Sequence, residues 1–334
     1  MAAWDRAPRG RFLITNQLVN IVFRSARQGP ARRTISDMQI VVAGGSGLLG
    51  TALVSRLRNE GHAITVLTRQ PRRAEDVQWT TRGSSASWAY VLEDADAVIN
   101  LAGAPIAKRW TTAHKREMWN SRVLSTRSLV AAMKSVRRVP PTLINASAVG
   151  TYGARGAEEL TEESAPGSGF LAALGAEWEK EALSAAPHAR VVLLRTGIVL
   201  AKEGGALPRM ALPFRFFAGG PLGSGRQYLS WIHLDDWTAM VSWALAVEAV
   251  SGPLNVTAPH PVTNLEFART LGRVLRRPAF IPTPTFALRA MLGEMAEAIV
   301  TGQQALPAKA HALGFEFTHP ELDGALRSIL SGTA

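Results

Sequence analysis

The feature that most restricts the fold is a run of glycines between an apolar segment and a helix-like one. Residues 40–43 are apolar and lead into Gly-Gly-Ser-Gly-Leu-Leu-Gly at residues 44–50, and apolar side chains then recur with helical spacing up to Gly61. Glycine at such a junction allows a tight turn and a close approach of the backbone to a ligand. The N–H groups at the start of the helix would then hold a pyrophosphate. A glycine-rich turn that binds nothing is the alternative.

The glycines satisfy two spacings at once. Gly45, Gly47 and Gly50 match the G-x-G-x-x-G pattern of dinucleotide-binding proteins, and Gly44, Gly47 and Gly50 match a wider spacing. A phosphate loop of the NTPase type is excluded, because the lysine that must precede its hydroxyl residue is missing before Thr51. We therefore expect a dinucleotide site at this turn.

From residue 38 onwards the expected strands and helices alternate, which is typical of a parallel sheet with crossover helices. The expected strands are residues 40–43, 64–67, 97–100, 143–146 and 191–194. The expected helices are residues 48–60, 115–135, 171–184, 235–249 and 288–301. The predicted fold class is therefore α/β, with a doubly wound parallel sheet of the Rossmann type and a smaller C-terminal α+β lobe.

Three regions are expected along the chain. Residues 1–37 are predicted to form a flexible N-terminal extension, residues 38–250 the dinucleotide-binding domain, and residues 251–334 the C-terminal lobe. The extension contains seven arginines and two acidic residues. Three interpretations of it remain open: an organelle-targeting peptide, an upstream-start artefact preceding Met38, or a solvated arm. The artefact or the arm is favoured, because Met38 leads directly into the first strand.

The amino-acid composition bears on the size of the core and on the cellular compartment. The chain has 334 residues, of which 47% are hydrophobic, and this suits a full-sized core. The absence of cysteine excludes disulfides and thiolate metal sites and fits a reducing compartment, so we expect a cytoplasmic protein. The apolar run at residues 237–247 is much shorter than the roughly 18 residues of a membrane helix.

The net charge of +11 does not by itself indicate nucleic acid, because nearly half of the excess lies in residues 1–37. The sequence also lacks an RNA-binding aromatic motif, and its seven histidines are not closely paired. A cofactor that bears phosphate explains cationic pockets more simply. We expect a small-molecule substrate, no nucleic acid, no membrane and no metal, and a homodimer is the assembly left open.

The end of the second expected strand indicates which dinucleotide is bound. NAD-preferring proteins of this fold carry an acidic residue there that binds the ribose hydroxyls. Residues 67–73 instead read Leu-Thr-Arg-Gln-Pro-Arg-Arg and contain no carboxylate. A guanidinium can pair with the 2′-phosphate of NADP, so Arg69, together with Arg72 or Arg73, favours NADP(H) over NAD. A solvated basic loop is the alternative.

With these motifs in order, the chain resembles the atypical extended short-chain dehydrogenase/reductases. Among them it is similar to the NAD-dependent epimerase/dehydratase-like family that ends in a small C-terminal domain of unknown function. The resemblance covers about residues 38–330. It rests on residues 41–50, Val-Ile-Asn-Leu-Ala-Gly at 98–103, Asn-Ser-Arg at 120–122, Asn-Ala-Ser-Ala-Val-Gly-Thr-Tyr-Gly at 145–153, and residues 194–200, 219–225 and 230–233.

The resemblance implies that NADP(H) is held by residues from several parts of the chain. These are Gly44, Gly47, Leu48 and Gly50 in the first turn, Thr68 and Arg69 at the adenosine end, Leu101, Ala102 and Gly103 at the sheet edge, and Glu117, Arg122 and Val199. Arg122 could serve as a second phosphate clamp, and Gly103 would let the ligand approach the backbone. For Arg122 and Glu117, an exposed ion pair on a helix is the alternative.

The catalytic pair of this superfamily is missing. Its enzymes use a tyrosine four residues before a lysine, so that the ammonium lowers the pKa of the phenol. The residues four positions after Tyr90, Tyr152 and Tyr228 are aspartate, glycine and isoleucine. By resemblance, Leu171 and Gly175 occupy the two positions. Ordinary epimerase or dehydratase chemistry is therefore in doubt.

Ser147 and Tyr152 are the candidate replacements, because they follow the strand whose end faces the nicotinamide in this fold. Glu179 and His233 are less favoured candidates. Each has a plain alternative: Ser147 a strand cap, Tyr152 a packed aromatic with a satisfied hydroxyl, Glu179 a solvated helix residue, and His233 part of a helix cap. The glycine-rich residues 219–226 would suit a loop that binds a substrate anion, or an ordinary turn between lobes.

Two functions remain open. The first is an NADP(H)-binding, epimerase-like oxidoreductase that acts on a small nucleotide-linked or carbonyl substrate, and the intact glycine turn favours it. The second is a non-catalytic NADP(H)-binding scaffold or regulator, which the missing catalytic pair favours. A hydrolase is disfavoured, because no serine lies in a G-x-S-x-G elbow and no metal-ligand cluster appears.

Overall fold

The computed structural model describes residues 38–80 and 87–331 of the chain. All of these residues belong to one compact unit, which spans residues 35–334. The predicted N-terminal extension, residues 1–37, lies outside the described residues.

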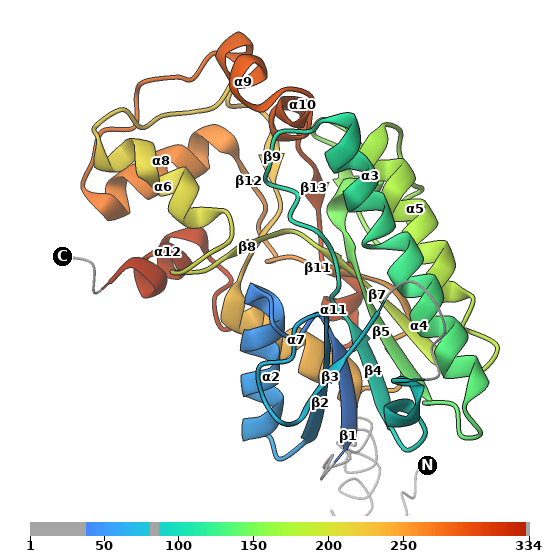
Figure 1. The fold of residues 1–334 in the computed structure, drawn as a ribbon. Helices are drawn as coiled ribbons and strands as arrows, with labels where there is room; N and C mark the ends of the chain where they lie inside the picture. The colour runs from blue at the N-terminus through green and yellow to red at the C-terminus, as the bar shows by residue number, and fades with distance from the viewer. Residues whose placement is uncertain (1–37, 81–86, 332–334) are drawn as a thin grey trace, which may run out of the picture. The chain divides into compact units, whose positions relative to one another are not determined.

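Within the described residues, seven strands form one sheet, and every neighbouring pair is parallel. Its order is β11-β7-β5-β4-β1-β2-β3 (Figure 1). The strands are β1 (Gln39–Ala43), β2 (Ala63–Thr68), β3 (Asp76–Gln78), β4 (Ala97–Asn100), β5 (Thr142–Ala148), β7 (Arg190–Thr196) and β11 (Gly252–Val256). The chain adds strands outward from β1 in one direction and then in the other. This order confirms the predicted doubly wound sheet, with its switch point between β1 and β4.

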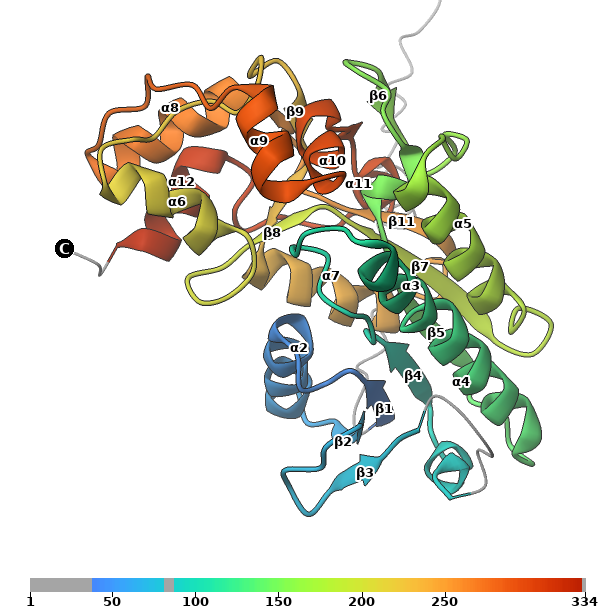
Figure 2. The same ribbon diagram turned by 45° about the horizontal axis from the view of Figure 1, so that its top comes forward.

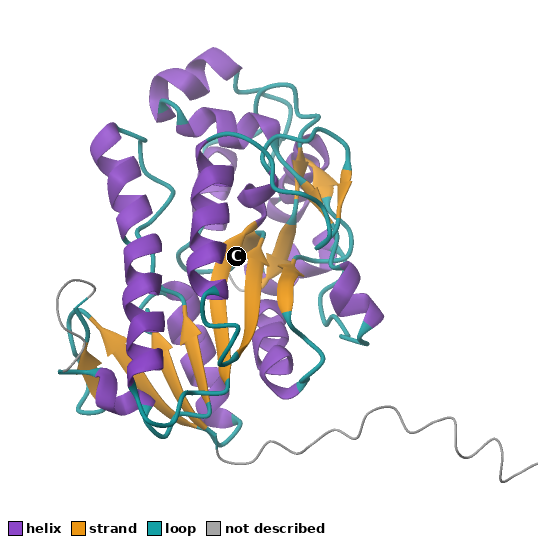
Figure 3. Ribbon diagram, turned by 90° about the vertical axis from the view of Figure 1, so that its right-hand side faces the viewer, coloured by secondary structure: helices purple, strands orange, loops and turns teal. Residues whose placement is uncertain are grey.

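Helices cover both faces of this sheet, as Figure 3 shows. The helices α2 (Leu48–Asn59) and α7 (Leu234–Ala246) pack on one face, and α4 (Val123–Ser135) and α5 (Phe170–Leu183) pack on the other. Alternate residues of β1 divide between them. Ile40 and Val42 join the core with α2 and α7, whereas Val41 and Ala43 join the core with α4 and α5. Burial on both faces explains why the strands are continuously apolar in sequence.

The other elements are shorter. The helices are α3 (Thr112–Asn120), α6 (Leu207–Arg215), α8 (Asn264–Leu275), α9 (Thr285–Leu292), α10 (Met295–Thr301), α11 (Ala308–Ala312) and α12 (Leu322–Leu330), with 3-10 turns η1 (Ala89–Leu92) and η2 (Val149–Tyr152). Three small strand pairs join β8 (Ile198–Leu200) to β10 (Trp231–His233), β9 (Tyr228–Leu229) to β12 (Val262–Thr263), and β6 (Glu159–Leu160) to β13 (Gln304–Ala305).

The smaller lobe is built from two separate stretches of the chain (Figure 2). Helix α6 packs with α8 and α12 around a core that includes Phe214, Phe267 and Leu326. Strand β11 belongs to the main sheet through its pairing with β7. The sheet therefore continues past the boundary predicted at residue 250, and the lobe begins before it. Tertiary pairing decided this boundary, because a strand of five residues is hard to distinguish from a loop in sequence.

Two helices that were predicted as continuous are broken in the structure. Residues 115–135 divide into α3 and α4 at Ser121, whose Oγ accepts a hydrogen bond from the N–H of Ala104. Residues 288–301 divide into α9 and α10 at Gly293, which has a φ of +62°. Apolar periodicity continues across both breaks, so the sequence pattern did not reveal them.

Candidate functional site

The glycine loop after β1 lies against the loop after β4. Gly44 has a φ of +82°, and a Cβ at this position would lie 2.8 Å from the carbonyl carbon of Leu101. A Cβ at Gly50 would lie 2.3 Å from the carbonyl oxygen of Gly44. Both positions therefore need glycine for the packing of the protein itself.

Gly47 differs from its two neighbours in the motif. Its φ of −79° is ordinary, and in the described structure a Cβ there would have only the carbonyl oxygen of Gly44 nearby, at 3.6 Å. Helix α2 begins here with no side-chain cap and no acidic residue in its first turn. The first N–H groups of α2 and the positive end of its dipole are therefore available to an anion.

A cavity of about 690 Å³ lies at the carboxyl ends of β1, β2 and β4. Its walls come from the glycine loop, the ends of β2 and β4, and helix α3. Most of the residues predicted to hold a dinucleotide line this cavity: Gly44, Gly47, Thr68, Arg69, Leu101, Ala102, Gly103 and Glu117. The structure thus brings together residues that are up to 73 positions apart in sequence.

Four predicted residues do not line the cavity. Gly50 lies beneath the glycine loop, and Arg122 lies behind the loop after β4. Leu48 and Val199 approach one another at Gly205, where a Cβ would lie 3.2 Å from Leu48 Cδ2 and 3.6 Å from the carbonyl oxygen of Val199. These last two therefore border the loop at 204–205 instead of the main cavity.

Several lining residues were not predicted. They are Ser46, Leu67, Trp79, Ala104, Pro105, Ala113, Arg116, Asn120, Ser121 and Leu124. The positions 113, 116, 117, 120 and 124 follow one another at helical spacing and so form one stripe along α3 and the start of α4. Their helical spacing in the sequence could have indicated that these residues share a face. The stripe is mostly polar, however, and a polar stripe is ordinarily a solvated face.

Arg122 is a buried guanidinium without a carboxylate partner in the described structure. It is 8% exposed, and a Cβ at Gly103 would lie 2.9 Å from its Cζ. Its Nη1 donates to the carbonyl oxygen of Met118 at 3.3 Å, and its Cζ lies 5.2 Å from the ring centroid of Trp178. Burial lowers the pKa of Arg122 to about 10. A buried cation with so few partners fits a site that is completed by an anion.

Glu117 has a different partner from the one that was considered. Its Oε2 lies 3.2 Å from Nδ1 of His114, and Nε2 of that histidine lies 2.9 Å from the carbonyl oxygen of Pro105. An exposed ion pair between Glu117 and Arg122 is therefore wrong, because Arg122 turns into the core.

The basic loop after β2 is held by one carboxylate. Asp76 Oδ2 accepts hydrogen bonds from the backbone N–H groups of Arg72 and Arg73, at 2.8 and 3.0 Å. Nη1 of Arg73 lies 4.0 Å from Glu75. Arg69 lines the cavity and has no ion pair with any described residue. Of the three arginines after β2, Arg69 is the one that lines the cavity where the adenosine end of the cofactor is predicted.

The two positions of the superfamily's catalytic pair cannot act as a pair here. A Cβ at Gly175 would lie 2.1 Å from Oγ1 of Thr151, so the helix packs too closely for a lysine. Leu171 packs on Gly150, where a Cβ would lie 3.2 Å from Leu171 Cδ1. The α5 helix is thus packed against η2 by small residues at the point where the usual enzymes carry their base.

Ser147 belongs to a buried ion-pair network. Its Oγ donates to Glu179 Oε1 at 2.6 Å. Arg195 donates hydrogen bonds to the same carboxylate from Nε and Nη2, each at 2.8 Å. Glu179 is 6% exposed, so its interpretation as a solvated helix residue is wrong. Its negative charge needs a partner in the core, and Arg195 supplies it.

Tyr152 lies on the other side of Arg195 and is fully buried. Its hydroxyl donates to Asn255 Oδ1 at 2.7 Å, lies 2.9 Å from the carbonyl oxygen of Thr161, and accepts from Arg195 Nη1 at 3.0 Å. Burial raises the pKa of Tyr152 above its usual value, although Arg195 acts in the opposite direction. Neither Tyr152 nor Ser147 lines the cavity at the glycine loop. This geometry matches the packed, hydrogen-bonded aromatic considered as the alternative for Tyr152.

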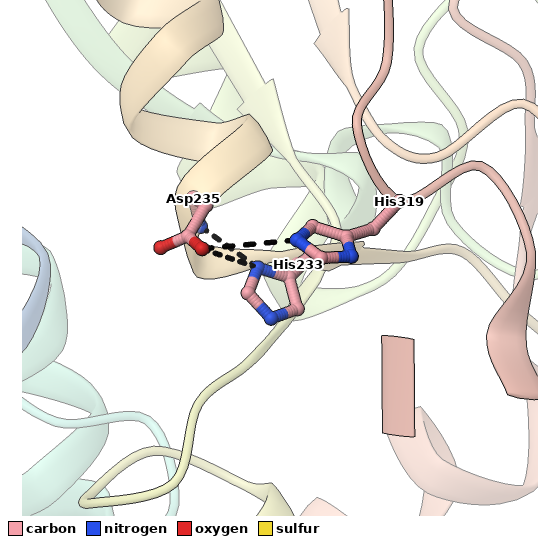
Figure 4. A group of neighbouring side chains, drawn as sticks. All are labelled: His233, Asp235 and His319. Carbon is pink, nitrogen blue, oxygen red and sulfur yellow. Dashed lines mark hydrogen bonds and ion pairs between the residues drawn. The ribbon is translucent and has the colours of Figure 1, made fainter. Parts of the chain in front are cut away.

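His233 lies at the start of α7 in a group with Asp235 and His319 (Figure 4). Its Nδ1 accepts from the N–H of Asp235 at 3.0 Å, so the histidine itself caps the helix. The His233 and His319 rings stack with centroids 3.8 Å apart, and each has a nitrogen 3.6 to 3.7 Å from Asp235 Oδ2. Nε2 of His233 lies 3.3 Å from Oγ of Ser328. The structure thus brings His233 and His319 together, although the sequence did not pair them, and one ligand atom from each of the three side chains lies within 4.8 Å of the others.

The glycine-rich residues 219–226 pack within the lobe. The N–H of Gly223 donates to the carbonyl oxygen of Thr283, and Asn264 Oδ1 accepts from the N–H of Leu222. No residue of this stretch lines the cavity at the glycine loop. These contacts agree with an ordinary turn inside the lobe.

A second cavity, of about 560 Å³, lies between the end of β5, the start of α5 and the α9–α10 region. It contains Leu171 and Gly150 in its lining, so it reaches the place where the superfamily carries its catalytic tyrosine. Because β4 and β5 are parallel neighbours, this cavity and the one at the glycine loop open at the same edge of the sheet.

The sheet order, the glycine turn after β1 and the cavity at the switch point define a Rossmann-type α/β protein. The chain matches the family model described as "NAD dependent epimerase/dehydratase family" over residues 40–256. It also matches "Domain of unknown function (DUF1731)" over residues 283–329. The chain belongs to the NAD-dependent epimerase/dehydratase family, which confirms the resemblance found in the sequence.

Two relatives illustrate the match. An epimerase family protein SDR39U1 homolog, chloroplastic, from Arabidopsis thaliana is 42% identical over 303 residues, covering 88% of this chain and 87% of the relative. The epimerase family protein YfhF of Bacillus subtilis is 42% identical over 301 residues, covering 88% of this chain and 98% of that protein.

One solved structure is that of human epimerase family protein SDR39U1 with NADPH. It has a TM-score of 0.81 and 35% sequence identity, and the match covers 88% of this chain and 99% of the human one. In residues 38–80 and 87–331, no helix combines the length and the apolar character needed to cross a membrane.

Proposed function

We propose that this chain binds NADP(H) at the glycine loop and is an epimerase-like oxidoreductase of a small carbonyl substrate. One observation carries the binding proposal: the N-terminus of α2 lacks any side-chain cap, and the missing side chain of Gly47 leaves space there that no described residue fills. Arg122, which has no carboxylate partner among the described residues, lies behind Gly103 of the cavity wall, and its positive charge would favour the same anionic ligand. The NADPH in the human relative's structure supports the choice of cofactor.

Different residues of the site would bind different parts of the cofactor. Gly44 and Gly50 would shape the turn, and the first N–H groups of α2 would hold the pyrophosphate beside Gly47. Thr68 and Arg69 would bind the adenosine end, where the guanidinium pairs with a 2′-phosphate.

The remaining predicted residues would bind the other half of the cofactor. Leu101, Ala102 and Gly103 would line the sheet edge, with Arg122 as a phosphate clamp behind Gly103. Glu117 would contact the cofactor from α3. Leu48 and Val199, which meet at Gly205, would contact it from the far side.

When bound, NADPH supplies a hydride from C4 of its nicotinamide ring. Ser147 is the proposed proton donor: its Oγ would give a proton to the carbonyl oxygen as the hydride adds to the carbonyl carbon, and it would regain a proton from water after the alcohol leaves. This Oγ also donates to Glu179, whose carboxylate accepts from Arg195 as well. Tyr152 touches Arg195 and is fully buried, so we propose it as a positioning residue for this network.

A second function is favoured by a specific observation. The close packing of Gly175 on Thr151 excludes the catalytic lysine, so the chain could be an NADP(H)-binding scaffold or regulator without turnover. Oxidation of NADPH in the presence of any member of a panel of aldehydes and ketones supports the oxidoreductase. Tight NADPH binding with no oxidation across the panel supports the scaffold.

The choice of NADP(H) over NAD(H) is tested at Arg69. Replacing it, Arg69→Asp, should weaken NADPH binding by roughly tenfold or more and change NADH binding little, because only NADPH carries the 2′-phosphate. Isothermal titration calorimetry measures both. Arg269→Asp, at an exposed position on α8, is the matched control. Equal losses for NADPH and NADH would contradict the assignment.

We also propose a cytoplasmic location and, as the assembly to test, a homodimer. The absence of cysteine supports the first. Fractionation of cells and light scattering of the purified protein are the measurements.

A further inference from the structure

The second cavity, between α5 and the α9–α10 region, has a largely apolar interior. Trp110 and Phe170 meet there edge to face, with ring centroids 5.4 Å apart. Leu171 and Ala298 complete this wall, and Leu171 packs on Gly150. A volume of about 560 Å³ lies in the range of sites that bury a small molecule.

The charged residues of this cavity lie at its rim and are paired. Arg289 Nη2 lies 3.3 Å from Glu297 Oε2, and Lys115 Nζ lies 2.6 Å from Glu294 Oε2. The side chains of Arg289, Glu294 and Glu297 are each more than 60% exposed. Arg289 is the one cation among the described lining residues, and it already has a carboxylate.

This charge arrangement is unsuited to a nucleotide diphosphate. A diphosphate carries at least two negative charges, and burying it requires unpaired cations or several aligned N–H groups. Here the two lining carboxylates, Glu294 and Glu297, would repel it. The sugar-nucleotide option that the sequence left open is therefore disfavoured.

The start of α5 offers a place for one oxygen atom. Gly169 precedes the helix with no side-chain cap, and the first turn contains no acidic residue. Gly169, Phe170 and Leu171 all line the cavity. The N–H groups at this helix start can donate to a carbonyl oxygen of a ligand whose ring packs on the aromatic wall.

We infer that this cavity binds a neutral, ring-containing carbonyl compound, with its ring against Trp110 and Phe170 and its oxygen toward the start of α5. The inference rests on the proposed function in one respect: the carbonyl carbon would lie beside the nicotinamide only if NADP(H) occupies the glycine loop. It concerns binding alone, so it is testable without turnover.

The test is a comparison of three probes on the full chain saturated with NADP⁺, which has no hydride to transfer: 2-acetylnaphthalene, 2-naphthoate and UDP-glucose. Calorimetry should give a dissociation constant for the ketone that is at least about ten times lower than for either anion. Ala298→Phe, which fills the cavity from α10, should weaken ketone binding by roughly tenfold or more. Ala290→Phe, exposed on α9 and outside the lining, should leave it unchanged.

Thr301→Phe provides a second obstruction of the same cavity in case Ala298→Phe folds poorly. Binding of UDP-glucose or 2-naphthoate as tight as that of the ketone would overturn the inference. So would ketone binding that neither obstruction weakens, or NADP⁺ binding without any ketone binding. Ketone binding without NADP⁺ binding would support this inference and overturn the proposed function, so the two failures are distinguishable.

Discussion

At the scale of single residues, the glycines of one motif have different roles. Gly44 and Gly50 are required by nearby backbone, at 2.8 and 2.3 Å from a hypothetical Cβ. Gly47 has no such neighbour, and its φ is ordinary. The motif therefore contains two glycines that the packing of the chain requires and one, Gly47, that this packing does not require.

The variants Gly47→Ala and Gly44→Ala should separate a role in ligand binding from a role in stability. Gly47→Ala should lower the free energy of unfolding by only about 0.5–1 kcal/mol, as expected for an N-cap glycine, yet weaken NADPH binding strongly. Gly44→Ala should destabilise the fold by more, because φ is +82° and the Cβ meets Leu101. Urea unfolding and calorimetry measure the two effects. Unchanged NADPH binding by Gly47→Ala would contradict the pyrophosphate position.

The buried charge of Arg122 should lower the free energy of unfolding when no anion is bound. We expect Arg122→Met to keep or raise the free energy of unfolding, because it removes a buried charge that lacks a carboxylate. The same change should weaken NADPH binding by roughly tenfold or more. Arg127→Met, which removes an exposed ion pair with Glu181, is the control and should change neither much. A large loss of stability in Arg122→Met would indicate a purely structural role.

At the scale of elements, an uncapped helix start borders each of the two cavities. The N-terminus of α2 faces the glycine-loop cavity, and that of α5 lies at the second cavity. In contrast, α7 begins with a side-chain cap, from His233. A ligand in either cavity would therefore meet helix N–H groups that no side chain caps in the described structure.

The cap of α7 should make stability depend on pH. Burial, followed by the charge of His319, lowers the pKa of His233 below 6.5, and Asp235 and Asp236 only partly oppose this. The unfolded chain therefore takes up a proton first on acidification. The stabilising contribution is present above pH of about 6.5 and is lost as the pH falls below it, so the free energy of unfolding should decrease from pH 7 toward pH 5.

His233→Asn isolates this effect, because asparagine also caps helices but does not titrate in this range. Its free energy of unfolding should fall less between pH 7 and pH 5 than that of the unchanged chain. His188→Asn, at an exposed position, should retain the original pH dependence. Identical pH profiles for His233→Asn and the unchanged chain would show that the cap is not the cause.

At the scale of the whole molecule, the C-terminal chain is bound into the sheet's own core. Phe315 and Ala310 pack in the core formed with α2 and α7. The buried carboxylate of Asp236 accepts hydrogen bonds from the N–H groups of Thr318 and His319, at 2.8 and 2.9 Å. The lobe and the sheet therefore share buried contacts, and we expect them to unfold together.

Cofactor binding should then stabilise the whole described unit. NADPH at 100 times its dissociation constant should raise the free energy of unfolding by about 2.7 kcal/mol, because it binds only the folded chain. NADH at the same concentration should raise it less, for lack of the 2′-phosphate. Urea unfolding followed by fluorescence measures both. An equal rise with the two dinucleotides would contradict NADP(H) preference, and no rise with either would contradict the site.

The amino-acid sequence alone predicted the α/β class with its doubly wound parallel sheet, and eight of the residues that line the cavity at the glycine loop. Those features are local: the glycine spacing, the apolar strands and the basic residues after β2 act within a few residues of one another. Tertiary structure decided the rest, because burial depends on partners distant in sequence. Arg195 made Glu179 a core residue, Asn255 satisfied Tyr152, and the contact of α5 with Thr151 left no room for a lysine.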